Sequence, residues 1–286
     1  MSNPQRARGQ SARARVAAQQ AEQRRRDQRR RMLTVGAVAV ALLAVVGIVI
    51  GSLVSRSPSQ QQASNGPLPA GVQANLTVPA STLAAVGIGS SSTQLLKPVT
   101  GPALVSGGKP EMLYIGAEWC PYCAAERWAM AVALSRFGSF TPLQGVHSSA
   151  TDAYPNTATL TFYRSAYTSK YLVFAPVENQ DVNHNLLVTP TAAQQALWSK
   201  YLPPGNGYPF IDIGNRFVAT STYNPQVLQG LSWSQIAADL HNPSSPVAKG
   251  AVGSANLLTA AICKITGNTP ASVCAAAPIA ALQARI

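Results

Sequence analysis

Cysteine and histidine are scarce in this chain of 286 residues, which has only four cysteines and three histidines. The seven residues are Cys120, Cys123, Cys263, Cys274, His147, His184 and His241. A structural zinc site needs about four such ligands at short spacings, but Cys263 and Cys274 are eleven positions apart and no histidine falls at ligand spacing. The sequence therefore argues against a metal site, and it implies no bound cofactor.

Acidic residues are also few, because ten Asp and Glu stand against 22 Lys and Arg and leave a net charge of +12. Most of this charge lies in residues 1–31, where ten Arg accompany only Glu22 and Asp27, a net charge of +8. A nucleic-acid-binding protein would be expected to spread its positive charge over one folded face. We therefore expect no nucleic-acid partner and interpret residues 1–31 as a basic cytoplasmic tail.

Charged side chains are absent from the next segment, residues 32–54, whose 23 residues are rich in Ala, Val, Leu and Ile. About 20 apolar residues are enough to cross a bilayer as a helix. A cleaved signal peptide is the alternative, but its apolar region would span only ~7 to ~15 residues. We favour an uncleaved signal anchor in the cell membrane. The arginines before it predict that the N-terminus stays in the cytoplasm and that the rest of the chain is exported.

Large apolar side chains are nearly absent from residues 55–75, where Ser, Gln, Asn, Gly and Pro prevail. Such a segment cannot bury enough surface to offset its chain entropy, which predicts a flexible linker. The chain from residue 76 onward shows no internal repeat and is long enough for one domain with an added element. All four cysteines lie beyond the apolar segment, in a compartment where disulfides persist.

The most informative sequence that is present is Cys120-Pro121-Tyr122-Cys123, between an apolar run at 112–117 and a helix-like stretch at 123–137. This position places Cys120 at a helix N-cap, where backbone N–H groups and the helix dipole favour an anionic sulfur. Thiols so placed have a pKa of ~3.5 to ~7.5, against ~8.5 for an unperturbed cysteine. We predict that Cys120 is the nucleophile and Cys123 the resolving thiol. A purely structural disulfide is the alternative.

Two segments resemble the thioredoxin superfamily. Residues 117–123, with Trp119 just before the first cysteine, are similar to its active-site turn, and residues 208–213 are similar to its cis-proline strand. The resemblance implies that Pro209 faces the dithiol across the fold. It also implies that Tyr208, the residue before this proline, offers backbone hydrogen bonds to an extended substrate.

The resemblance implies an α/β, thioredoxin-like fold over residues 76–245. The fold would carry an inserted β/α element within 139–205 and a C-terminal helical extension, and one transmembrane helix would precede it. The whole exported part resembles a bacterial family of membrane-anchored thioredoxin-like proteins known only as a domain of unknown function. This second resemblance implies a fold and little about biology.

Apolar periodicity and turn residues predict the other elements. We expect a short helix at 79–86, a strand at 112–117 and a next strand at 143–147. The alternating segment 158–163 and the apolar segment 171–177 together look like an added β element. Further helices are expected at 191–201, after Pro190, and at 232–240, where Ser232 and Gln235 fit a capping box.

One position departs from the superfamily pattern. Thioredoxins carry a buried carboxylate six positions before the first cysteine, where it relays the proton of the resolving thiol, and here that position is Tyr114. We expect a substitute relay from Glu126, three residues after Cys123, or from Glu118, in either case through a water. The alternative is that both glutamates are solvated surface charges.

The C-terminal segment, residues 246–286, is predicted to form a pair of Ala-rich helices broken at 267–270. Cys263 and Cys274 flank the break and could join the two helices as a structural disulfide. The alternative is a second redox pair that passes electrons between the first dithiol and a membrane partner.

These features together predict a membrane-anchored, extracytoplasmic thiol–disulfide oxidoreductase. Its partners would be exported protein thiols or disulfides and a possible membrane electron-transfer partner. Oxidation or isomerisation is favoured over reduction. The alternative is a non-catalytic thioredoxin-like binding module of the cell envelope, in which the Cys120–Cys123 pair is a permanent structural disulfide.

Overall fold

The computed structural model describes residues 66–202 and 207–286. The basic tail, the apolar segment 32–54 and the first part of the linker lie outside the described residues. Within the two described ranges, no helix is both long and apolar enough to span a bilayer.

The fold is mixed α/β, and its main sheet is built around strand β4 (Lys109–Gly116). On one side β4 pairs antiparallel with β10 (Phe210–Ile213), and on the other it pairs parallel with β9 (Val173–Glu178). The sheet is completed by β11 (Phe217–Ala219) beside β10, β2 (Leu96–Pro98) beside β11, and β3 (Val105–Ser106) beside the start of β4.

Strand β4 is central because both of its faces are buried. Successive strand residues point to opposite faces. Met112 and Tyr114 accordingly lie in one hydrophobic cluster, and Leu113 and Ile115 lie in another. All four side chains are fully buried. A strand covered on both faces has a continuous apolar sequence instead of an alternating one, as residues 112–117 have.

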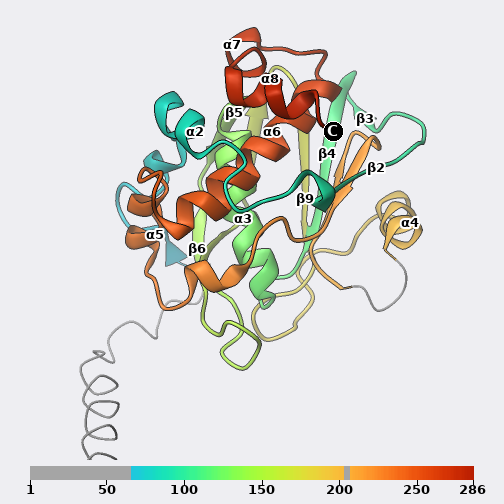
Figure 1. Cartoon of the computed structure of the whole chain (residues 1–286). Coiled ribbons are helices and arrows are strands. Elements are labelled where there is room, and N and C mark those ends of the chain that lie inside the picture. The colour runs from blue at the N-terminus through green and yellow to red at the C-terminus, as the bar shows by residue number, and fades with distance from the viewer. Residues whose placement is uncertain (1–65, 203–206) are drawn as a thin grey trace, which may run out of the picture. The chain divides into compact units, whose positions relative to one another are not determined.

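Helices cover the two faces of this sheet. On the Tyr114 face, α3 (Pro121–Leu134) packs against α6 (Gly253–Ile265). On the Leu113 face lies α4 (Ala192–Tyr201), which contributes Leu197 and Trp198 to the second cluster. Figure 1 shows α3 and α6 close together and α4 apart from them. The dithiol sequence therefore stands between the central strand and a helix that is itself covered by another helix.

Four further strands lie between α3 and β9, within the range where we expected an insertion. β5 (Gly138–Thr141) pairs with β8 (Ala166–Ser169), and β6 (Gln144–His147) pairs with β7 (Ala158–Thr161) and β1 (Gly66–Pro67). One expectation is corrected here. Within the expected segment 171–177, residues 173–177 belong to β9, the parallel neighbour of β4, and not to an added element. An apolar run of this length could form a strand of the main sheet or of an added element, because the local sequence does not determine which distant strand the run pairs with.

The folded part begins earlier than residue 76, where we expected the linker to end. Gly66 and Pro67 pair with β6, and a short 3₁₀ helix, η2, spans Ala74–Leu76. Val72 is buried, with 1% of its surface exposed. The few apolar side chains of residues 66–75 pack onto the domain and hold this stretch in place.

Two of the shorter helices begin at capping boxes, and the second of these was expected from the sequence. The capping box of Thr191 and Gln194 begins α4, and that of Ser232 and Gln235 begins α5 (Trp233–Asp239). In each box the N-cap hydroxyl accepts a hydrogen bond from the glutamine backbone N–H, and the glutamine side chain accepts one from the N-cap backbone N–H. The other short elements are α2 (Ala80–Val86), η3 (Thr93–Leu95) and η4 (Pro225–Leu228).

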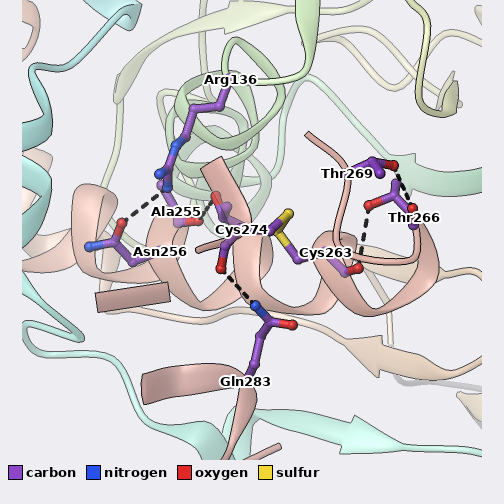
Figure 2. Close-up of a disulfide and its surroundings, with 9 residues drawn as sticks. Arg136, Ala255, Asn256, Cys263, Thr266, Thr269, Cys274 and Gln283 are labelled. Atoms are coloured by element: carbon purple, nitrogen blue, oxygen red, sulfur yellow. Dashed lines mark hydrogen bonds between the residues drawn. A yellow bond between two sulfur atoms is a disulfide. The ribbon is translucent and has the colours of Figure 1, made fainter. Parts of the chain in front are cut away.

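The C-terminal segment is part of the same core. A π-helical turn, η5 (Ala248–Val252), leads into α6, which is buried from Gly253 to Cys263. The second expected helix is divided into α7 (Ala271–Cys274) and α8 (Ala277–Gln283), because Pro278 begins a new helix. Cys263 and Cys274 form a disulfide, which is the pairing expected from the sequence. Figure 2 shows it joining α6 to α7, with Gln283 bound to the Cys274 carbonyl oxygen at 3.0 Å.

Removing this disulfide should reduce stability without affecting the dithiol. A ring closed across 11 positions contributes about 3 kcal/mol on the loop-entropy estimate. We expect a Cys263→Ser/Cys274→Ser double variant to lose about that much free energy of unfolding in urea titrations. If the variant kept its stability and lost disulfide exchange at Cys120, the pair would be redox-active instead of structural.

Candidate active site

Cys120 is the N-cap residue of α3. Its backbone is extended (φ −76°, ψ 120°), the helix begins at Pro121, and the Cys120 Sγ accepts a hydrogen bond from the Cys123 backbone N–H at 3.3 Å. Proline suits the first helical position because it has no N–H to leave unpaired there. In most helices a side-chain oxygen of the N-cap residue accepts this hydrogen bond. In α3 the acceptor is a sulfur, which can carry negative charge.

The two thiols have pKa values displaced in opposite directions. A hydrogen bond from the Cys123 thiol, together with the Cys123 backbone N–H and the charge of Arg127, lowers the pKa of Cys120 against the opposing effect of burial. Complete burial raises the pKa of Cys123 well above its ordinary value. Both cysteines are free thiols in this structure. Cys120 is therefore the better nucleophile, and Cys123 is poised to act only on a sulfur that is already bound next to it.

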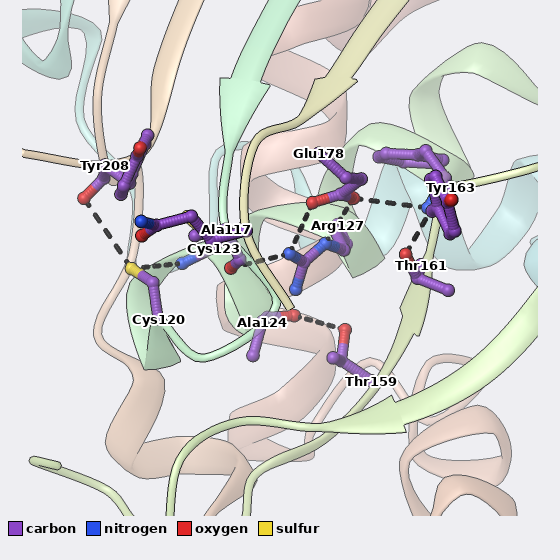
Figure 3. Close-up of polar contacts among 12 residues, drawn as sticks. Ala117, Cys120, Cys123, Ala124, Arg127, Thr159, Thr161, Tyr163, Glu178 and Tyr208 are labelled. Carbon is purple, nitrogen blue, oxygen red and sulfur yellow. Dashed lines mark hydrogen bonds and ion pairs between the residues drawn. The ribbon is translucent and has the colours of Figure 1, made fainter. Parts of the chain in front are cut away.

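The structure brings Tyr208, the residue before Pro209, to the dithiol. The Tyr208–Pro209 peptide bond is cis. The Cys120 thiol donates to the Tyr208 carbonyl oxygen across 3.7 Å, and Figure 3 shows this contact together with the bond to the Cys123 N–H. The nucleophilic sulfur thus lies beside a backbone segment that runs directly into β10.

Glu126, by contrast, is directed elsewhere. Its carboxylate accepts hydrogen bonds from the backbone N–H and hydroxyl of Thr222, and burial raises its pKa to about 7. At about 100° per residue, position 126 is turned about 60° from Cys123 around the helix, which directs it to the loop before η4. The Glu126 carboxylate is therefore bound to Thr222, and the expected relay through Glu126 stays a prediction. Glu118 and Glu126 are both fully buried, so neither is a surface charge.

The sequence analysis missed the strongest charge interaction near the dithiol. Arg127, four residues after Cys123, forms a bidentate ion pair with Glu178 at the end of β9, with N–O distances of 2.7 and 2.8 Å. The same guanidinium donates to the Ala117 carbonyl oxygen at 2.8 Å. Figure 3 shows it between Glu178 and the dithiol turn. A lone arginine at the i+4 position of an Ala-rich helix was the available signal, because its side chain shares a face with Cys123.

Tyr114 occupies the position at which thioredoxins have a carboxylate. Its side chain is fully buried on the α3 face of β4. Burial raises its pKa, the charge of Arg127 opposes this, and negative charge on Cys123 raises it further, so the hydroxyl lies close to both groups. Gly116 makes room for this hydroxyl, because a Cβ at that position would overlap it.

Aromatic side chains surround the exposed side of the dithiol. Tyr208 stacks on Trp198 with ring centroids 5.2 Å apart and meets Trp119 edge-on at 5.8 Å. Trp119 in turn lies 4.7 Å from His184. Tyr122, between the two cysteines, is 40% exposed. These rings form an apolar rim beside the nucleophilic sulfur.

Metal-binding side chains do not gather in the described part of the chain, where no three His, Cys, Asp or Glu lie together as ligands.

The comparisons with known proteins give one match. A family model matches residues 98–206, a stretch that contains the dithiol, Arg127 and Glu178. It is a domain of unknown function, DUF929. The DUF929 match ends before Tyr208 and covers less than half of the chain. It agrees with the expected resemblance to a domain of unknown function and assigns no activity. No curated protein and no solved structure matches the chain.

Proposed function

We propose that this protein is a membrane-anchored, extracytoplasmic thiol–disulfide oxidoreductase that acts on exported proteins. The observation that carries the proposal is the environment of Cys120. Its sulfur caps α3, accepts the Cys123 N–H at 3.3 Å and lies 3.7 Å from the Tyr208 carbonyl oxygen. An N-cap thiol with a lowered pKa and a second thiol two residues on is the arrangement that disulfide exchange requires.

A thioredoxin-like fold is part of this proposal, and the strand arrangement supports it. The dithiol lies between β4 and α3, β9 runs parallel to β4, and β10 and β11 form an antiparallel hairpin on the other side of β4. The segment before β10 brings a cis proline to the dithiol. In this fold the additional strands β5 to β8 are an insertion, and α6 is the C-terminal helix of the core.

The reaction has two steps. The Cys120 thiolate attacks one sulfur of a substrate disulfide, so that a Cys120–substrate disulfide forms and the other substrate sulfur leaves with the electron pair. Cys123 then attacks the Cys120 sulfur, so that the Cys120–Cys123 disulfide forms and the second substrate sulfur leaves. The protein loses two electrons and the substrate gains them. Oxidation of a substrate dithiol is the same sequence in reverse.

The lowered pKa of Cys120 favours oxidation or isomerisation as the direction. Stabilising the thiolate stabilises the reduced form of the pair, which raises its reduction potential. A membrane electron carrier would then reoxidise the dithiol. Since 30 mV corresponds to ~1.4 kcal/mol for a two-electron couple, a small change in this stabilisation would alter the direction.

The aromatic rim favours a polypeptide substrate. Trp119, Tyr122 and Tyr208 present large rings that can contact varied apolar side chains at a small cost in conformational entropy. We expect these substrates outside the cytoplasm, because the basic residues 1–31 and the apolar segment 32–54 predict an exported domain.

Mixed-disulfide trapping tests the proposal. In a Cys123→Ser variant the second step is blocked, and we expect disulfide-linked adducts with cell-envelope proteins that disappear on reduction. A Cys120→Ser/Cys123→Ser variant is the matched control and should give none. If Cys123→Ser gave no adducts and Cys120 stayed unreactive toward iodoacetamide after mild reduction, the protein would be a binding module with a structural CxxC.

A further inference from the structure

The ion pair of Arg127 and Glu178 is a buried salt bridge, whose two side chains are 0% and 1% exposed. Moving two charges from water into the interior costs several kcal/mol per ion, and their attraction repays this only with good geometry and further hydrogen bonds. The pair has both, since Glu178 also accepts the Phe162 N–H at 3.2 Å. Such a pair adds little to the net free energy of folding. Stability alone therefore does not explain why the pair lies beside the dithiol.

Two polar groups around this pair keep unused hydrogen-bonding capacity. Within the described ranges, Nη1 of Arg127 and the hydroxyl of Tyr114 have no hydrogen-bond partner of normal geometry, although both are completely buried. An unsatisfied buried donor destabilises the folded state. Both groups act electrostatically on Cys123, whose sulfur is also completely buried. The unused donors therefore lie in the region where negative charge must develop when Cys123 ionises.

We propose that Arg127, held by Glu178, is a positioning residue that stabilises negative charge on the two sulfurs, chiefly on Cys123 during the second step. This inference rests on the proposed function. The guanidinium is always protonated, and so it provides a fixed positive charge beside the dithiol turn, where it donates to the Ala117 carbonyl oxygen. Glu178 fixes the orientation of the guanidinium and offsets part of its charge.

The proton balance of the second step follows from this arrangement. Cys123 loses its proton as its sulfur bonds to Cys120, and the leaving substrate sulfur, which takes the electron pair, takes up that proton. Arg127 stabilises the negative charge that develops on the buried Cys123 sulfur. The Tyr114 hydroxyl can donate a hydrogen bond to the same sulfur. No other oxidant or reductant than the substrate disulfide is needed.

Two substitutions are expected to shift the pKa of Cys120 in opposite directions. The titratable groups that face the sulfurs are Tyr114 from β4, Arg127 from α3 with Glu178 behind it, and Tyr208 before β10. Arg127→Met removes the positive charge and should raise the pKa of Cys120 by about one pH unit. Glu178→Gln removes the neutralising charge, leaves the guanidinium more effective, and should lower that pKa.

The measurement is the pH profile of iodoacetamide alkylation of Cys120 in the reduced full-length protein. Below the pKa, we expect about a tenfold lower rate for Arg127→Met, a higher rate for Glu178→Gln and a near-normal rate for Arg127→Lys, which keeps the charge. The matched control is Arg136→Met, because Arg136 lies in the turn just after the same helix and bonds Asn256 at 3.4 Å. It should leave the profile unchanged.

The outcomes separate the inference from the proposed function. If the unsubstituted protein showed no exchange at Cys120, the proposed function would fail. If it exchanged disulfides, but Arg127→Met and Glu178→Gln left the profile unchanged or moved it in the same direction, the pair would be purely structural and the inference would be wrong. Should Arg127→Met not fold, Glu178→Gln and Arg127→Lys still give the sign of the effect.

Discussion

Replacing Cys120 with serine should abolish disulfide exchange. The Cys120 sulfur is the nucleophile in either direction of the reaction, and a serine hydroxyl at the same N-cap is not ionised near neutral pH. We expect a loss on the order of 10³-fold or more in the rate of oxidative refolding of a reduced substrate protein, as for other covalent nucleophiles. Because serine is itself a good N-cap residue, the variant should fold with unchanged stability.

The contrast with Cys123→Ser makes this prediction specific. That variant keeps the nucleophile and should still form mixed disulfides, but it should release them slowly. If Cys120→Ser retained exchange activity, the activity would have to arise from Cys263 and Cys274, and the assignment of the active site would be wrong.

Raising the pH from 4 to 8 should destabilise the folded protein through its buried carboxyl groups. Burial raises the pKa of Glu126 from its model-peptide value of 4.5 to about 7, and that of Asp212 to about 6. The folded state therefore holds these protons more tightly than the unfolded chain does. The stabilisation is complete below the unfolded pKa and is lost as the pH rises through the folded pKa, and Glu126 accounts for roughly 3 kcal/mol of it.

Urea unfolding of Glu126→Gln at several pH values tests this contribution. The amide stays neutral, so the variant should lose the Glu126 part of the pH dependence and keep an acceptor for Thr222. The matched control is Asp152→Asn, at an exposed carboxyl group, which should leave the pH dependence unchanged. If Glu126→Gln followed the unsubstituted protein at every pH, the proton on Glu126 would not be coupled to folding. A loss of disulfide exchange in this variant would instead support its role as a proton relay.

The part of the site that could be predicted from the sequence is the part built by local interactions. The N-cap sulfur, Pro121 at the first helical position and the N–H of Cys123 all lie within four residues, and helix capping is determined over such distances. The capping box of Ser232 and Gln235 was predictable for the same reason. Tyr208 and Pro209 are distant in sequence, and only the resemblance to a known superfamily brought them to the dithiol.

The contacts that could not be predicted join residues far apart in the chain. Glu178 lies 51 positions from Arg127, and Thr222 lies 96 positions from Glu126. Helical periodicity gives each helix residue a direction but does not identify the group it meets there. This is why the contact of Glu126 with Thr222 was not foreseen and Arg127 was overlooked, although Arg127 lies on the same face of the helix as Cys123.

The position of β9 shows the same limit at the level of the fold. Residues 171–177 have the continuous apolar sequence of a buried strand, and residues 173–177 do lie in β9. The pairing partner depends on the whole chain between α3 and β9. The intervening strands β5 to β8 form small sheets of their own and leave the place beside β4 to β9.

The reduction potential of the Cys120–Cys123 pair, measured by equilibration with glutathione, tests the central claim most directly. We predict a reversible two-electron equilibrium with a potential between ~−120 and ~−180 mV, in the range of proteins that oxidise or isomerise disulfides. A pair that stayed oxidised down to potentials below ~−300 mV would be a structural disulfide, and that result would contradict the proposed function.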